Sequence, residues 1–229
     1  MGMDDARDEA ARLLSRGGPL DALGEIKRLA GAEGGEGDDA RFREAYVLGL
    51  ARARAGEWDE ALLYLEQVVT GEPASERGRQ CRMALAYVYA MTGRFRLAEY
   101  EVRKLMESGA RSSQLMAFLG YAAWAQGRAD EAIGKYGKAL ELDPENANAL
   151  NGLGYALACE GREPAKAMTC CRKAVDKKPD NAAYLDSLGW AYYKLGYVEE
   201  ARDYLGRALA RAPDEPEIQT HVRAVESGR

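Results

Sequence analysis

The chain has 229 residues, of which 47% are hydrophobic and 30% charged, and its formal net charge is −5. This mild acidity argues against nucleic acid as a partner, because a nucleic-acid-binding protein needs a clustered basic face. No apolar run approaches the about 18 residues that mark a membrane-spanning helix, so we expect no membrane insertion.

Glycines divide most of the chain into intervals of nearly equal length. Five of them follow one another at spacings of 37, 34, 34 and 35 residues, and an alanine stands five or six residues after each. These five are Gly56, Gly93, Gly127, Gly161 and Gly196. A period near 34 indicates an array of small units, each packed on its neighbours, rather than a single globular core.

The last of these units follows the spacing of a specific repeat pattern, W-x₂-L-G-x₂-Y…A-x₃-F…P, with leucine at the tryptophan and phenylalanine positions. The residues on its positions are Leu185, Leu188, Gly189, Tyr192, Ala201, Leu205 and Pro213. The chain therefore resembles the tetratricopeptide repeat (TPR) proteins, of bacterial type. The resemblance implies an all-α fold, a right-handed superhelical solenoid of antiparallel helix pairs, with a concave surface lined mainly by the first helix of each pair.

In chain order, this frame predicts a degenerate TPR-like helix pair over residues 1–36 and a linker over residues 37–41. Five repeats then follow. We place them at 42–75, 79–112, 113–146, 147–181 and 182–215. Residues 216–229 predict a polar helix that caps the apolar face of the last repeat, since a terminal unit of an array has no further neighbour.

Three irregularities interrupt the frame. The insert Glu76-Arg77-Gly78 separates the first two repeats and either lengthens a helix or loosens the join. The second repeat has Ala110 where the others have proline, so we expect its last turn to run differently. The fourth repeat carries one extra residue before Ala167, and Pro164 there is expected to begin a helix.

Small residues recur at fixed positions of both helices and predict a close approach of the two. In the first helix the column reads Gly49, Ala86, Gly120, Gly154 and Gly189. In the second helix it reads Ala61, Ala98, Ala132, Ala167 and Ala201.

The ninth position of the repeat is aromatic in four of five copies: it reads Leu50, Tyr87, Tyr121, Tyr155 and Trp190. Tyrosine and tryptophan offer a large contact area with a polar tip, which suits them as interface anchors. Together with neighbouring first-helix positions they give the candidate peptide groove Arg43, Tyr46, Arg54, Met83, Tyr87, Tyr121, Trp124, Asn151, Tyr155, Asp186, Trp190, Tyr193 and Lys194. Packing of the same aromatics between neighbouring repeats is the alternative.

Little in the sequence suggests catalysis. The single histidine, His221, lies in the expected capping helix, which argues against a histidine-based triad and a histidine-rich metal site. We therefore expect no enzyme, no cofactor and no metal. The four cysteines form no C-x-x-C pair and are expected to be reduced, with one of the adjacent Cys170 and Cys171 facing the interior and the other nearer the surface.

The sequence thus favours a non-enzymatic module that binds a peptide or helix of a partner protein in the concave groove. One alternative is a scaffold that acts through self-association, as a homo-oligomer, in the assembly of a bacterial machine such as a pilus, a secretion system or an organelle. Another is a TPR domain taken from a longer regulator. We expect a cytoplasmic location, or a periplasmic one if a native leader precedes Met1-Gly2-Met3 in the cell.

Overall fold

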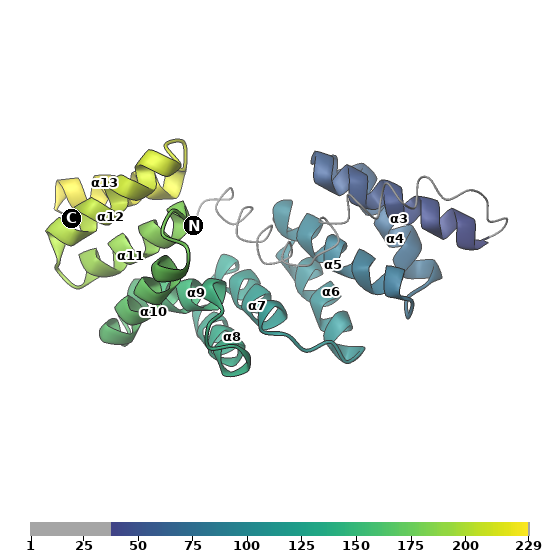
Figure 1. The fold of residues 1–229 in the computed structure, drawn as a ribbon, viewed down its shortest axis with the longest axis horizontal. Helices are drawn as coiled ribbons and strands as arrows, with labels where there is room; N and C mark the ends of the chain where they lie inside the picture. Colours follow the sequence, from purple (N-terminus) through teal and green to yellow (C-terminus); the bar gives the residue numbers. More distant parts are fainter. Residues whose placement is uncertain (1–37, 229) are drawn as a thin grey trace. The chain divides into compact units, whose positions relative to one another are not determined.

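The computed structural model describes residues 38–228, which form eleven α-helices and no strand (Figure 1). The helices are α3 (Asp38–Ala55), α4 (Trp58–Gly71), α5 (Glu76–Met91), α6 (Phe95–Glu107), α7 (Ser113–Ala125), α8 (Ala129–Leu142), α9 (Ala147–Cys159), α10 (Pro164–Lys177), α11 (Ala182–Lys194), α12 (Val198–Arg211) and α13 (Pro216–Ser227). None of these helices is long and apolar enough to cross a bilayer. The all-α fold class is therefore confirmed for the described residues.

The described residues separate into two compact units, one of residues 38–111 with α3–α6 and one of residues 112–228 with α7–α13. We describe each unit by itself. The predicted helix pair over residues 1–36 lies outside the described residues and stays a prediction.

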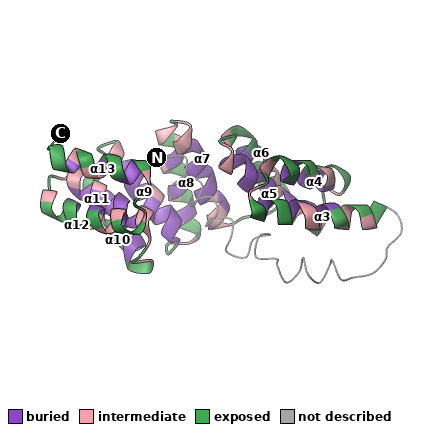
Figure 2. Ribbon diagram, turned by 90° about the horizontal axis from the view of Figure 1, so that it is seen from above, coloured by how far each residue is buried: buried purple, intermediate pink, exposed green. Residues whose placement is uncertain are grey.

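Consecutive helices pack as pairs within each unit. In residues 38–111, α3 packs on α4 and α5 on α6, and α4 also contacts α5. In residues 112–228 the pairs are α7 with α8, α9 with α10 and α11 with α12, while α13 packs on α12 and α11. The first helices α7, α9 and α11 also contact one another in sequence. Buried residues are concentrated on these first helices, above all on α9, as Figure 2 shows by colour.

The glycines that set the repeat frame end the first helices in the left-handed conformation. Their φ angles lie between +64° and +83°, a region in which a Cβ atom would clash with the backbone. In the second repeat, α6 ends at Glu107 and its last turn is followed by Gly109 with a φ of +97°. A glycine thus ends the helix there without proline, which agrees with the expected difference in its last turn.

Helix starts differ from the predicted frame at two points. Helix α3 begins at Asp38, so residues 38–41 belong to the helix rather than to a linker. Two aspartates in its first turn favour this early start, since negative charge complements the N-terminal end of the helix dipole. Helix α5 begins at Glu76, so the insert lengthens the helix; Ser75 caps it by accepting the N–H of Gly78 at 2.9 Å.

The extra residue of the fourth repeat is absorbed in the turn before α10. Pro164 is the first residue of that helix, as predicted, and the preceding Glu163 has a left-handed φ of +43°. A left-handed conformation costs a residue other than glycine about 1–2 kcal/mol, so this turn is locally strained.

The small residues of the first helices lie where the second helices approach most closely. A Cβ atom on Gly154 would lie 2.5 Å from the sulfur of Cys171, and one on Gly189 would lie 2.7 Å from Leu205. Real side chains essentially never pack so tightly, so the predicted close approach is confirmed at these positions. Of the cysteine pair, Cys171 faces the interior and Cys170 lies nearer the surface, as expected, although at 8% exposure Cys170 is also buried, because α10 packs against both α9 and α11.

Candidate functional site

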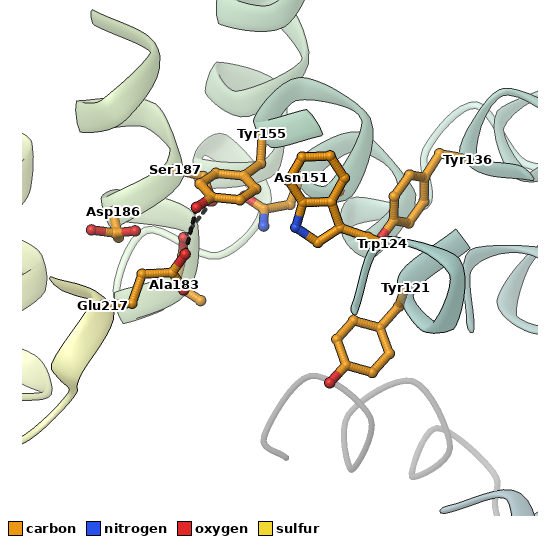
Figure 3. A pocket seen from close by; sticks show the side chains of 10 residues that line it. Tyr121, Trp124, Tyr136, Asn151, Tyr155, Ala183, Asp186, Ser187 and Glu217 are labelled. Carbon is orange, nitrogen blue, oxygen red and sulfur yellow. Dashed lines mark hydrogen bonds between the residues drawn. The ribbon is translucent and has the colours of Figure 1, made fainter. Parts of the chain in front are cut away.

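A hollow opens on the first helices of the unit formed by residues 112–228 (Figure 3). It encloses about 460 Å³ that protein atoms do not fill, a volume that includes open solvent at its mouth. The first helices α7, α9 and α11 and the C-terminal helix α13 supply its wall, and α8 adds one tyrosine. The lining residues are Tyr121, Trp124, Tyr136, Asn151, Gly152, Tyr155, Ala183, Asp186, Ser187 and Glu217.

Side-chain caps fix where the helices that carry this wall begin. Asn146 caps α9 by accepting the N–H of Ala149 at 3.0 Å, and its amide donates to the Ser113 hydroxyl of α7 at 2.8 Å. Asn181 caps α11 in the same way. Because a cap sets the first turn, it also sets which residues of the following helix face the hollow.

The hydroxyl group of Tyr155 on α9 donates a hydrogen bond to the Glu217 carboxylate on α13, the dashed line in Figure 3. Both side chains are buried. Burial and the neighbouring charge of Glu217 raise the pKa of the Tyr155 phenol far above its usual value. Tyr155 therefore remains a hydrogen-bond donor at every physiological pH.

A second buried pair joins α11 to α13. The ring nitrogen Nδ1 of His221 lies 2.9 Å from both carboxylate oxygens of Asp186, which is only 2% exposed. Burial raises the pKa of Asp186, and the bond to His221 acts in the opposite direction. A buried carboxylate needs such a partner, because an isolated charge away from water is costly.

Aromatic rings surround His221. Its imidazole stacks on Trp190 with ring centroids 4.1 Å apart and an interplanar angle of 16°, and Tyr155 lies 6.1 Å away. The ammonium of Lys194 is 4.8 Å from the Trp190 centroid. Trp190, which is half-buried, thus packs against the C-terminal helix.

Asn151 on α9 brings an acceptor to the hollow. Its side chain is 7% exposed, and its oxygen Oδ1 is buried without a hydrogen-bond partner. A buried acceptor in this state costs about 1–3 kcal/mol compared with a paired one. Trp124 on α7 stands beside Tyr155 in an edge-to-face contact, with ring centroids 5.8 Å apart and an interplanar angle of 79°.

Five of the predicted groove residues meet at this hollow. They are Tyr121, Trp124, Asn151, Tyr155 and Asp186. The other candidates of the same unit, Trp190, Tyr193 and Lys194, lie beside it, around His221 and α13. Within the described residues, no group of three histidine, cysteine, aspartate or glutamate side chains is placed to hold a metal ion.

The remaining candidates belong to the unit of residues 38–111 and make contacts within it. Tyr46 is buried and donates to Gln80, while Tyr87 is buried against Trp58 in an edge-to-face contact at 6.0 Å. Contacts of this kind are expected if the aromatic side chains pack between neighbouring repeats instead of lining a groove. Of the other three, one pairs with an aspartate, one is exposed and one is half-buried: Arg43, Arg54 and Met83.

Sequence reasoning missed the acidic and histidine contributions of α13. Both Glu217 and His221 were assigned only to a capping helix. Extending the repeat frame past residue 215 would have placed Glu217 at the second position of a sixth first helix, which is a groove position. Tyr136 was missed because it comes from a second helix, where the repeat pattern predicts only packing.

Family models for the tetratricopeptide repeat match residues 46–112, 119–182 and 182–215. The chain belongs to the tetratricopeptide repeat family. The first two matches each span two helix pairs and the third spans one, and these helix pairs are the units that the family repeats.

Curated relatives share parts of this array. A TPR repeat-containing protein of Pseudomonas aeruginosa is 42% identical over 83 residues, which cover 36% of this chain and 14% of the relative. The cellulose synthase operon protein C of Pseudomonas fluorescens is 30% identical over 165 residues, covering 69% of this chain and 13% of the relative. The chain spans less than a fifth of the length of these relatives.

Solved TPR structures have the same fold. MamA aligns with a TM-score of 0.61 at 23% identity, covering 76% of this chain and 93% of MamA. YrrB aligns with a TM-score of 0.57 at 18% identity, covering 90% of this chain and 97% of YrrB. A chain of the Cut9–Hcn1 complex aligns with a TM-score of 0.76 at 19% identity, covering 96% of this chain and 42% of that chain. At these identities the likeness concerns the fold alone.

Proposed function

We propose that this chain is a non-enzymatic interaction module that binds a peptide segment of a partner protein, with the hollow of residues 112–228 as its anchoring point. The observation that carries this proposal is the hollow itself, which gathers aromatic and polar side chains from α7, α8, α9, α11 and α13 at one place. Concave sites of this kind, with rings for contact area and a few convergent polar groups, are the usual form of a binding site.

Membership in the TPR family supports the same proposal. YrrB, which shares the fold, is described as a TPR protein with an unusual peptide-binding site. The predicted aromatic column contributes two side chains to the hollow, Tyr121 and Tyr155. Tryptophan and tyrosine anchors dominate the energetics of many protein interfaces, and Trp124 is the half-buried anchor available here.

A test must spare the buried tyrosines, because removing Tyr121 or Tyr155 would disturb the packing of the helices as well as any binding. We suggest filling the hollow instead, with Ala183→Trp, and removing its anchor, with Trp124→Ala. Tyr197→Ala serves as the matched control, since Tyr197 is 51% exposed and does not line the hollow.

The full chain is used to select binders from a displayed library of random dodecapeptides, whose affinities are then measured by fluorescence anisotropy. Both hollow variants should weaken the selected peptides at least tenfold, about 1.4 kcal/mol, with an unchanged circular dichroism spectrum, while Tyr197→Ala binds as the wild type. Equal binding to all three folded variants would refute the hollow as the anchoring point. Failure to enrich any peptide would refute peptide binding itself.

The assembly alternative has its own measurement. Sedimentation equilibrium of the full chain separates a monomer from a self-associating scaffold. A strict monomer at high concentration argues against self-assembly and leaves the peptide-binding proposal unaffected.

A further inference from the structure

We propose that the hollow accepts an uncharged carboxamide, the side-chain group of an asparagine or glutamine of a bound peptide. This inference rests on the proposed function and names the chemical group that the hollow recognises. Three features of the wall support it: carboxylates that already have partners, a buried amide whose oxygen is unmatched, and flat aromatic surfaces beside that amide.

The two carboxylates of the wall give no reason to prefer a charged guest. Both oxygens of Asp186 lie 2.9 Å from Nδ1 of His221. Glu217 accepts the hydroxyl of Tyr155 and has further electrostatic partners. An anion would meet both carboxylates, and a cation would have to displace the partners that they already have, although removing any charge from water is costly. The guest is therefore uncharged.

Asn151 supplies the polar contact that a neutral guest needs. It is 7% exposed, and Figure 3 shows its side chain among the aromatic rings of the wall. Its oxygen Oδ1 accepts no hydrogen bond from the residues that the structure describes. Two other buried asparagines near the start of α9 are paired: Asn146 accepts the N–H of Ala149, and Asn148 accepts the hydroxyl of Tyr184. The acceptor that packing leaves unmatched is thus the one at the hollow, where a guest with N–H groups can match it.

The side chain of asparagine or glutamine fits this amide better than a main-chain peptide group does. A primary carboxamide carries an N–H and its C=O on the same side, so it can donate to Oδ1 of Asn151 and accept from the Asn151 NH₂ group at once. A trans peptide group holds its N–H and C=O on opposite sides, so it forms only one of these two bonds. The paired arrangement also forms in either orientation of the Asn151 amide, because the guest offers both a donor and an acceptor.

Flat surfaces beside Asn151 suit a planar guest. Trp124, Tyr136 and Tyr155 line the hollow, and the rings of Trp124 and Tyr155 stand at 79° to each other. The Tyr136 ring lies so close to Gly152 that a side chain there would overlap it. The wall next to Asn151 therefore consists of backbone and ring, without a protruding side chain. A carboxamide can lay its plane against such rings while its edge meets Asn151, and its methylene stem covers apolar ring surface.

Small probes test this preference directly on the full chain by nuclear magnetic resonance titration. Propionamide should produce saturable shifts of the Trp124 indole N–H and the Asn151 side-chain amide at millimolar concentration. Three probes of similar size should bind at least fivefold more weakly at the same ionic strength: butan-2-one, which has no N–H; N-methylpropionamide, which carries a trans peptide group; and n-propylammonium, which is charged. Equal or tighter binding of any of the three would overturn the proposal.

Two identical substitutions then locate the contact. Asn151→Leu should abolish the preference for propionamide over butan-2-one, and its urea midpoint should equal or exceed that of the wild type, because it removes an unmatched acceptor. Asn148→Leu, three residues earlier, should keep the preference but lower the midpoint, because it leaves the buried hydroxyl of Tyr184 without this acceptor. A preference that survives in Asn151→Leu protein would overturn the proposal. So would a loss of stability as large as that of Asn148→Leu, since Asn151 would then have a structural role.

Peptides separate this inference from the function on which it rests. Selected peptides should contain an asparagine or glutamine whose replacement by leucine or methionine weakens binding at least tenfold, while replacing a neighbouring main-chain amide by an ester has no such effect. If Ala183→Trp weakens the peptides but they tolerate the side-chain replacement, the carboxamide preference is refuted while peptide binding stands. If only the ester weakens binding, the amide comes from the main chain and the side-chain assignment is wrong. If no peptide is enriched, peptide binding is refuted and the propionamide titration decides the carboxamide preference by itself.

Discussion

At the scale of single residues, the absence of a Cβ atom on certain glycines allows the paired helices to approach closely. The four first-helix glycines of the small-residue column each face a side chain of the second helix, at distances too short for a Cβ atom: Gly49, Gly120, Gly154 and Gly189. Protein interiors are packed as closely as organic crystals, so the second helix cannot yield without a cost.

The first prediction compares two identical substitutions. In Gly154→Ala the new methyl group would lie 2.5 Å from the Cys171 sulfur and 2.8 Å from the Ala167 carbonyl oxygen. Overpacking of this kind costs about 1–3 kcal/mol. Gly134→Ala on α8 meets no atom within 4 Å and should stabilise by about 0.5–1 kcal/mol, because alanine favours helix more than glycine does.

Urea unfolding followed by circular dichroism measures both variants against the wild type. The two substitutions should move the transition midpoint in opposite directions. A Gly154→Ala protein as stable as Gly134→Ala would show that the helices separate freely, contrary to the packing described here.

At the scale of elements, α13 differs from a simple polar cap. It contributes two buried polar side chains to the neighbouring helices, Glu217 toward Tyr155 of α9 and His221 toward Asp186 of α11. These polar contacts specify one docked position for α13, since a shift would leave buried groups unpaired.

The second prediction concerns the buried pair of α11 and α13. His221→Ala leaves the Asp186 carboxylate buried without this partner and should destabilise by about 3–5 kcal/mol at neutral pH. Asp186→Asn keeps a neutral hydrogen bond to the histidine and should cost only about 1 kcal/mol. Equal costs in urea unfolding would show that the uncompensated charge is not the cause.

The pH dependence of the His221→Ala variant follows from the same argument. Burial raises the pKa of Asp186, and the variant lacks the histidine bond that opposes this rise. The folded state of the variant then holds the proton more tightly than the unfolded state, whose carboxyl pKa is about 3.9. Its stability is fully present below that pH and is lost as the pH rises through the folded pKa, so the deficit should widen from about pH 4 toward neutrality.

At the scale of the whole molecule, the helix pairs form two units that each have their own buried interior. In repeat proteins, stability is approximately a sum of repeat and neighbour-interface contributions, so part of an array can fold when its ends are covered. The unit of residues 112–228 ends in α13, which covers α12 and α11.

The third prediction is that a fragment of residues 112–228 folds by itself. It should show the helical circular dichroism expected from α7–α13 and one cooperative urea transition, and should keep the stacked Trp190–His221 contact, detectable as ring-current shifts in the nuclear magnetic resonance spectrum. A fragment without cooperative unfolding would mean that this unit depends on the rest of the chain.

The sequence determines much of this architecture because the repeat pattern ties residue type to position. The glycine spacing located the ends of the first helices, and proline located the start of α10. It could not locate the early start of α3, because two aspartates in a polar stretch are equally compatible with a linker. A periodic pattern predicts the structural features that all repeats share, and it predicts little about features found in a single repeat.

The hollow shows the same limit. Five predicted side chains reach it because they occupy corresponding faces of first helices. The burial of Tyr121 and the covering of Trp190 by His221 depend on contacts between repeats, which no single repeat encodes. Glu217 belongs to a helix that follows the five predicted repeats. Its contact with Tyr155, 62 residues away in sequence, could therefore be found only from the structure.

That long-range bond has a thermodynamic consequence. Glu217 serves two equilibria, since it helps to hold α13 in place and forms part of the wall of the hollow. Under the proposed binding role, a guest that contacts α13 inside the hollow would change the free energy of attaching α13, and by reciprocity the attachment of α13 would change the affinity for that guest by the same factor. Any interaction that stabilises or releases the C-terminal helix would then also change the affinity of the hollow, without contacting α7, α9 or α11.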